Sequence, residues 1–131
     1  MPSIDTNVLV RWLVRDEADQ ARSVDRLLDD AVSEPLFVPL TVLLETEWVL
    51  RSRYRFDRGS IATTLDMLLS TTELEFQQEP AIEQAIWLFK QPASPDFADC
   101  LHVGLCRHAG REPLLTFDAR AAKLSGAALV R

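Results

Sequence analysis

Short apolar segments alternate with amphipathic helical segments along this chain, and this order limits the possible folds more than any other feature. Segments with the length and composition of buried strands lie near residues 2–5, 35–38, 74–76, 113–116 and 128–130. Strands separated by helices pair in parallel, because each crossover helix returns the chain to the same end of the sheet. The sequence therefore predicts an α/β fold with a mostly parallel, five-stranded central sheet.

Apolar residues at helical spacing fill the intervals between these strands. One helix is predicted after Asp16-Glu17-Ala18-Asp19, which resembles a capping signal. Its apolar positions are Ala21, Val24, Leu27, Leu28 and Ala31. The same period occurs over residues 61–69 and 82–89, and another helix is expected from Asp96 toward Gly110, after the break at residues 92–95. With 131 residues and no linker or repeat, the chain is predicted to form one domain over residues 1–131.

Composition narrows the functional classes. No apolar run approaches the roughly 18 residues of a membrane span, and no signal peptide opens the chain, so we expect a cytoplasmic protein without a membrane partner. Cys100 and Cys106 lack metal or redox spacing and are expected to be reduced thiols. The net charge of −6 argues against broad attraction to nucleic acid, although a carboxylate cluster that binds cations contributes to that charge. The three tryptophans fall in apolar helical patterns and are expected in the core.

Two predicted strands end in a hydroxyl residue next to an acid. Asp5 follows the first strand, and Thr6 comes next. Thr116, Phe117 and Asp118 close a later strand in a similar way. Ligands of open α/β sheets bind outside the carboxyl ends of the strands, so both acids are candidates for a site there. Either acid can instead cap the helix that follows, and Thr116 can simply end its strand as a β-branched residue.

A third acid is expected in the apolar helical segment of residues 42–50, which contains Glu45 and Glu47. Two residues along a helix correspond to about 200° of rotation, so the two carboxylates point to nearly opposite faces. Glu47 has Arg51 four residues later, which predicts an ordinary surface ion pair. Glu45 has only apolar neighbours at helical spacing and is predicted to project from a buried apolar face. A buried carboxylate needs a partner or a metal ion, which makes Glu45 the functional candidate.

Asp96 and Asp99 lie one turn apart at the start of a predicted helix. Capping and the helix dipole favour acids at both positions without any catalysis. Asp99 can nevertheless do both jobs, because a helix that begins at a crevice carries its first-turn acid there. Asp96 is the better candidate for a cap alone.

Taken together, the acids favour a site for Mg²⁺ or Mn²⁺, since such ions prefer carboxylate oxygens and neutralise closely packed negative charges. No glycine-rich nucleotide motif, metal-ligand histidine pattern or Cys/His dyad is present. A metal-dependent phosphatase usually has a second Asp two residues after the first, where this chain has Asn7. A receiver-like domain needs a lysine near its acids, and only Lys90 and Lys123 are available.

These residues together resemble the PIN-domain ribonucleases, most closely VapC-type toxins of toxin–antitoxin pairs, over essentially the whole chain. The four motifs begin at Asp5, Glu45, Asp96 and Thr116. The resemblance implies a PIN-like three-layer α/β/α sandwich around the sheet. It also assigns Asp5, Glu45, Asp99 and Asp118 as catalytic and metal-binding acids. By the same resemblance Asn7, Asp96 and Thr116 support the pocket.

The resemblance further implies the reaction and the partners. The metal would be Mg²⁺ or Mn²⁺, the substrate RNA, and the reaction phosphodiester hydrolysis. A homodimer and a cognate antitoxin that blocks the site are implied as well. Arg11, Arg15 and the arginines of residues 51–58 are candidates for RNA-backbone contact, with antitoxin contact or plain solvation as alternatives. The competing hypothesis is a non-catalytic PIN-like protein-interaction domain, in which the acids only cap helices.

Overall fold

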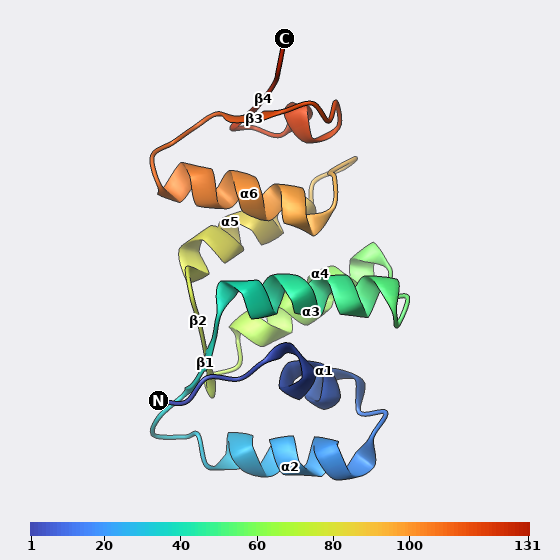
Figure 1. The fold of residues 1–131 in the computed structure, drawn as a ribbon, viewed down its shortest axis with the longest axis vertical. Coiled ribbons are helices and arrows are strands. Elements are labelled where there is room, and N and C mark those ends of the chain that lie inside the picture. The colour runs from blue at the N-terminus through green and yellow to red at the C-terminus, as the bar shows by residue number, and fades with distance from the viewer. The chain divides into compact units, whose positions relative to one another are not determined.

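The chain packs as two compact units, Met1–Gln77 and Gln78–Arg131, in a computed structural model that describes residues 1–131. The helices and strands of the first unit are α1 (Thr6–Val14), α2 (Ala18–Asp29), β1 (Leu36–Val38), α3 (Leu40–Ser52), α4 (Arg58–Leu69) and β2 (Leu74–Phe76). Those of the second are α5 (Glu79–Phe89), α6 (Phe97–His108), β3 (Leu114–Thr116), the 3₁₀ helix η1 (Ala121–Lys123) and β4 (Ala127–Leu129) (Figure 1).

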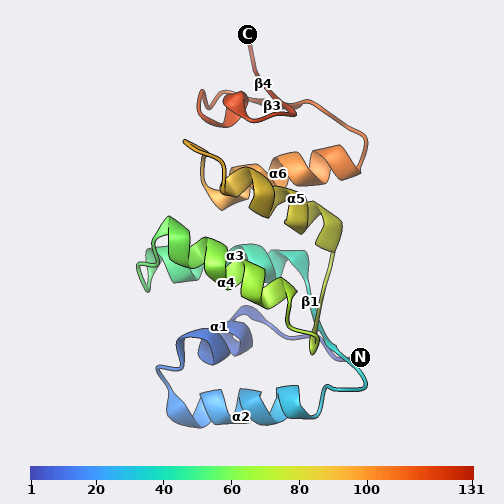
Figure 2. The same ribbon diagram turned by 180° about the vertical axis from the view of Figure 1, so that it is seen from behind.

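In the first unit, β1 and β2 form a parallel pair in which Leu36 lies opposite Leu74. The chain start runs beside β1, as the blue ribbon shows in Figures 1 and 2. A single parallel bridge joins Ser3 to Phe37, and the Ile4 N–H donates to the Phe37 carbonyl at 3.0 Å. Helix α1 packs against both α2 and α3. This arrangement carries the chain from a strand-like start directly into α1, with Asp5 at the junction.

In the second unit, α5 packs closely along α6, and β3 pairs in parallel with β4. Gly104 of α6 permits the close approach, because a Cβ atom there would lie 2.6 Å from the Ala81 carbonyl oxygen of α5. Phe89 and Phe97 meet edge to face, with ring centroids 5.9 Å apart. Strand β3 also contacts α6, so the end of β3 and the start of α6 belong to one packed body.

The helices agree with the apolar periods in the sequence. Helix α2 begins after Glu17, whose side chain accepts the Asp19 N–H at 3.2 Å, which confirms the capping signal. Helices α4, α5 and α6 span the three other predicted regions. In α6, Cys100 is a buried free thiol, and Cys106 is a half-buried one. The tryptophan prediction is wrong, because Trp48 and Trp87 are 57% and 58% exposed and Trp12 is half-buried.

Four of the five predicted strands form within about a residue of their expected positions. The first, near residues 2–5, is reduced to the bridge at Ser3. The α/β class and the parallel pairing are confirmed, in two separate strand pairs. The single five-stranded sheet stays a prediction. No helix has the length and apolar character needed to cross a membrane.

Candidate functional site

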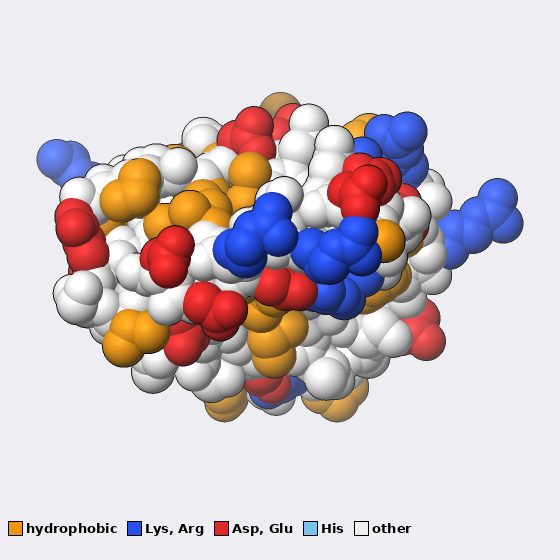
Figure 3. Space-filling view, turned by 90° about the horizontal axis from the view of Figure 1, so that it is seen from below, with side chains coloured by type: hydrophobic (Ala, Val, Ile, Leu, Met, Phe, Trp, Pro, Cys, Tyr) orange, Lys and Arg blue, Asp and Glu red, His pale blue; other side chains and the backbone are white.

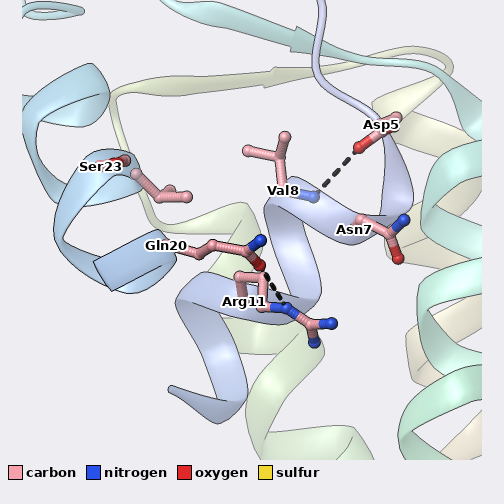
Figure 4. Close-up of a pocket in the computed structure, with 7 residues that line it drawn as sticks. Asp5, Asn7, Val8, Arg11, Gln20 and Ser23 are labelled. Atoms are coloured by element: carbon pink, nitrogen blue, oxygen red, sulfur yellow. Dashed lines mark hydrogen bonds between the residues drawn. The ribbon is translucent and has the colours of Figure 1, made fainter. Parts of the chain in front are cut away.

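Asp5 occupies the N-cap of α1, with extended backbone angles that turn the strand-like start into the helix. Its Oδ1 accepts the Val8 N–H at 3.0 Å, so the capping role is confirmed. Figure 4 shows this bond among the residues that line a cavity. The Asp5 side chain is exposed, and Oδ1 alone takes the capping bond. The second oxygen is therefore available to a ligand while the cap stays in place.

Thr6 connects Asp5's turn to α3, a role that the sequence did not reveal. Its side chain is buried, and its hydroxyl donates to Oε1 of Glu45, 39 residues away along the chain. The only signal in the sequence is a hydroxyl residue between an acid and an apolar helix. The bond fixes one oxygen of Glu45 beside the turn that carries Asp5.

The predicted environments of Glu45 and Glu47 are wrong. Glu45 is exposed, whereas Glu47 is only 2% exposed. The pairing of Glu47 with Arg51 is confirmed, since the Arg51 Nε donates to Glu47 Oε2 at 2.9 Å, but this is a buried carboxylate and not a surface pair. The reason is the buried stripe of α3, which consists of Leu43, Thr46, Glu47 and Leu50. Glu47 Oε1 and Thr46 Oγ1 lie buried there without hydrogen-bond partners.

Asn7 lines the same cavity as Asp5, between α1 and α2. The cavity has a volume of about 310 Å³, and its other lining residues are Val8, Arg11, Gln20, Ser23 and Val24. The Arg11 Nε donates to the Gln20 side chain at 2.7 Å across this cavity (Figure 4). Asn7 is exposed and can therefore contribute an amide oxygen beside Asp5.

The arginines nominated for RNA contact already have protein partners in several cases. Arg15 forms a forked pair with Asp25, at 2.9 and 2.6 Å, and Arg11 lies 3.5 Å from Asp16. Acidic and basic side chains lie next to one another on the face in Figure 3. Such mixed charge gives little net attraction for a phosphate backbone. Arg11 and Arg15 are accordingly explained by these local contacts.

Asp96 and Asp99 open α6 in the second unit. Asp96 holds the N-cap position with an extended backbone, but its side chain makes no capping hydrogen bond, so the expected cap is confirmed in position only. Its carboxylate is exposed. Asp99 lies in the first turn and is half-buried. Of the two, Asp99 is the acid that packing holds in a defined place.

Asp118 is held in a tight turn between β3 and η1. Its Oδ1 accepts the N–H groups of Arg120 and Ala121, each at 2.8 Å, and its own N–H donates to Thr116 Oγ1 at 3.0 Å. Thr116 thus ends its strand and also fixes the backbone of Asp118. Asp118 thus makes the hydrogen bonds of a cap, although the N-cap residue of η1 is Arg120. The Asp118 side chain is exposed as well.

Two neighbouring acids of the second unit act electrostatically on Asp99. Burial raises the pKa of Asp99 most, the negative charges of Asp118 and Asp96 raise it further, and His102 opposes them. A cation bound beside Asp99 would favour the ionised form of its carboxylate. The raised pKa makes Asp99 a candidate residue of a functional site.

The donors fit a hard divalent cation. Asp5 and Glu45 of the first unit and Asp96, Asp99 and Asp118 of the second all supply carboxylate oxygens, which suit Mg²⁺ and Mn²⁺. The structure contains no group of three or more Asp, Glu, His or Cys side chains that could hold a metal ion. His102 and His108 are exposed.

Comparisons with known proteins cover nearly the whole chain. A model of the PIN domain family matches residues 3–127. A curated relative from Aquifex aeolicus (strain VF5), named VapC ribonuclease, is 26% identical over 126 residues, which cover 95% of this chain and 92% of the relative. The span of the family match contains all four acidic motifs.

Proposed function

Because the chain belongs to the PIN domain family, we propose that it is a metal-dependent endoribonuclease that hydrolyses phosphodiester bonds in RNA, the toxin of a VapBC-type toxin–antitoxin pair. The observation that carries the proposal is the family match over residues 3–127, which includes every acid nominated from the sequence. The Aquifex relative named VapC ribonuclease supports the choice of substrate.

We assign Asp5, Glu45, Asp99 and Asp118 to the metal site, with Mg²⁺ or Mn²⁺ as the ion. Asn7, Asp96 and Thr116 support the same pocket. When bound, the ion supplies a water of lowered pKa and stabilises the leaving oxygen. The four acids would hold the ion through their carboxylate oxygens.

Hydrogen bonds from two threonines support this assignment. The Thr6 hydroxyl donates to one oxygen of Glu45 and restricts the orientation of that carboxylate. Thr116 fixes the backbone at Asp118, and the Arg120 and Ala121 N–H groups hold Asp118 Oδ1. These contacts leave each of the two acids with one oxygen committed to the protein and one for a ligand.

The partners and the wider architecture belong to the same proposal. The family resemblance supports a homodimer, a cognate antitoxin that occupies the site, a single PIN domain over residues 1–131, and one five-stranded sheet in a three-layer sandwich. Size-exclusion chromatography with light scattering tests the dimer. A search for a short reading frame beside the gene, followed by co-expression of its product with this chain, tests the antitoxin.

The decisive experiment is RNA cleavage with Mg²⁺ or Mn²⁺ by wild type, Asp5→Asn and Asp30→Asn. Asparagine keeps the capping acceptor at residue 5, so the fold should survive while cleavage is lost. Asp30 is an exposed acid at the end of α2 and serves as the matched control. Equal activity of wild type and Asp5→Asn would contradict the proposal.

One observation favours a second candidate, a non-catalytic PIN-like interaction domain. Asp5 and Asp118 both make the hydrogen bonds of ordinary caps. Calorimetric titration with Mn²⁺ separates the two functions. A nuclease shows saturable binding that Asp99→Asn abolishes, whereas a protein whose acids only cap helices shows none.

A further inference from the structure

A second cavity lies wholly within the Gln78–Arg131 unit, between the end of α5, the following loop and η1. Its volume is about 240 Å³, and its lining comes from Trp87, Leu88, Gln91–Pro95, Arg120 and Lys123–Ser125. Cavities that enclose drug-sized ligands have about 300–1,000 Å³, so this one suits a single flat group with the remainder of the ligand outside. None of the assigned acids lines it.

Trp87 gives the cavity an aromatic wall. The residue lies in the last turn of α5 and is 58% exposed, although the buried face of the same helix is filled by aliphatic residues and Phe89. A large exposed indole at a cavity has no role in holding the core. Aromatic side chains in such positions stack on the bases of single-stranded nucleic acid, whatever the base.

The lining of the cavity also includes two cations, Arg120 and Lys123, and no lining residue is acidic. The charge of the cavity lining is therefore opposite in sign to that of the whole chain, which has a net charge of −6. Both side chains are exposed. A cavity lined by an aromatic ring and two cations matches a ligand that combines a flat ring with a phosphate.

The rim of the cavity is fixed by hydrogen bonds. The buried Ser94 hydroxyl donates to the Leu88 carbonyl, and the Gln91 side chain donates to the Trp87 carbonyl at 3.0 Å. The Arg120 Nε donates to the Ala93 carbonyl at 3.2 Å, which ties the loop to the turn after β3. The indole and the guanidinium are therefore presented on an ordered frame, and binding there loses little loop entropy.

The same residues adjoin the acids of this unit. Arg120 donates its N–H to Asp118 Oδ1, and the loop ends at Pro95, directly before Asp96. We propose that this cavity binds one nucleotide of a single-stranded RNA next to the cleaved phosphodiester, with its base stacked on Trp87 and a phosphate paired with Lys123 and Arg120. The inference rests on the proposed ribonuclease function and adds to it a subsite that positions the strand.

Binding tests the subsite without cleavage. The full-length protein is titrated into a fluorescein-labelled single-stranded RNA of about 12 nucleotides in EDTA, and the dissociation constant is measured by anisotropy at several salt concentrations. Trp87→Ala should weaken binding about 5- to 100-fold, and Trp87→Phe should retain most of the affinity. Lys123→Gln should reduce the slope of log K against log salt by about 0.7.

The chain offers matched controls in its other unit. Trp48 is 57% exposed, and Arg22 is an exposed cation paired with Asp19. Trp48→Ala and Arg22→Gln should leave the RNA affinity unchanged. Unfolding curves of all variants check that each is folded at the assay temperature.

The outcomes separate this inference from the proposed function. If the wild type cleaves RNA and Trp87→Ala and Lys123→Gln bind and cleave it equally well, the subsite is wrong and the nuclease stands. Loss of RNA affinity in these two variants, with no metal-dependent cleavage by wild type, supports the subsite and contradicts the nuclease. Unchanged RNA affinity in both variants overturns the subsite.

Discussion

The two units hold their acids in different ways. In Met1–Gln77, Asp5 and Glu45 are exposed and positioned by neutral donors, namely the Val8 N–H and the Thr6 hydroxyl. In Gln78–Arg131, the pKa of Asp99 rises through burial and through the negative charges of Asp118 and Asp96. The first arrangement orients carboxylates by hydrogen bonds, whereas in the second burial and neighbouring charges disfavour the ionised form of Asp99. The difference teaches that metal binding should depend on charge in one unit and on geometry in the other.

The largest expected effect comes from neutralising the carboxylate of Asp99, whose pKa is raised. Asp99→Asn should reduce cleavage at least about 100-fold, because losing even an indirect partner of a metal ligand costs 10–100-fold. It should also abolish saturable Mn²⁺ binding measured by calorimetry. Asp96→Asn is the matched control at an exposed position one turn away and should have a much smaller effect. If Asp99→Asn binds Mn²⁺ like wild type, metal binding does not depend on the charge of Asp99.

Within the first unit, Glu45 and Glu47 should separate activity from stability. Glu47→Ala should lower the free energy of unfolding by about 2 kcal/mol, because it empties a buried site and removes the pair with Arg51, which keeps partial access to water. Glu45→Gln keeps an acceptor for the buried Thr6 hydroxyl, so it should leave stability nearly unchanged and abolish cleavage. Urea unfolding of metal-free protein and cleavage assays at a temperature where both variants are folded test the pair. Equal stabilities would contradict the assignment of Glu47 to the core.

Glu45 and Glu47 also show which features of the structure the sequence alone does not determine. The helices were predictable because apolar spacing and caps such as Glu17 are local. The buried face of α3 was not predictable, because apolar residues surround both glutamates in the sequence. Packing against α1 and α4 decides which side of α3 faces inward. Similarly, the Thr6–Glu45 bond joins residues 39 apart, and no local pattern encodes it. The predicted burial of Trp48 and Trp87 was wrong for the same reason, because apolar neighbours in the sequence do not ensure apolar neighbours in space.

The acids of the candidate site were predictable as residue types at strand ends and helix starts. Capping bonds at Asp5 and Asp118 formed as expected of such positions, whereas the missing bond at Asp96 depends on a side-chain rotamer that sequence does not set. Pairing of strands distant in the chain is the least predictable part, since the first strand is reduced to one bridge at Ser3.

A smaller effect is expected from the neutral donor that orients Glu45. Thr6→Val keeps the shape of the buried side chain and removes its hydroxyl, and it should weaken Mn²⁺ binding and kcat by about 10-fold. Thr6→Ser keeps the donor and should restore most of both. A purely structural role for Thr6 would instead lower the melting temperature and leave the Mn²⁺ affinity of the folded protein unchanged.

The smallest effect is the pH dependence of stability in the metal-free protein. Because the folded state raises the pKa of Asp99, the folded chain holds more protons than the unfolded chain just above the ordinary aspartate pKa of about 3.9. The Asp99 contribution is therefore complete below that pKa and is lost as the pH rises through the folded-state pKa. At pH 7, Asp99→Asn should melt roughly 2 °C higher than wild type, and the gap should close toward pH 4.

Asp25 provides the control of opposite sign. The hydrogen bond from Arg15 lowers the pKa of Asp25, so its stabilising contribution is present at neutral pH and is lost as the pH falls through the folded-state pKa. Asp25→Asn should consequently melt below wild type at pH 7 and converge with it in acid. Melting curves of the two variants between pH 3 and pH 7, in chelator, should therefore diverge from wild type in opposite directions. If both variants melt on the same side of wild type at pH 7, Asp99 and Asp25 do not have opposite effects on stability. That result would contradict the raised pKa of Asp99.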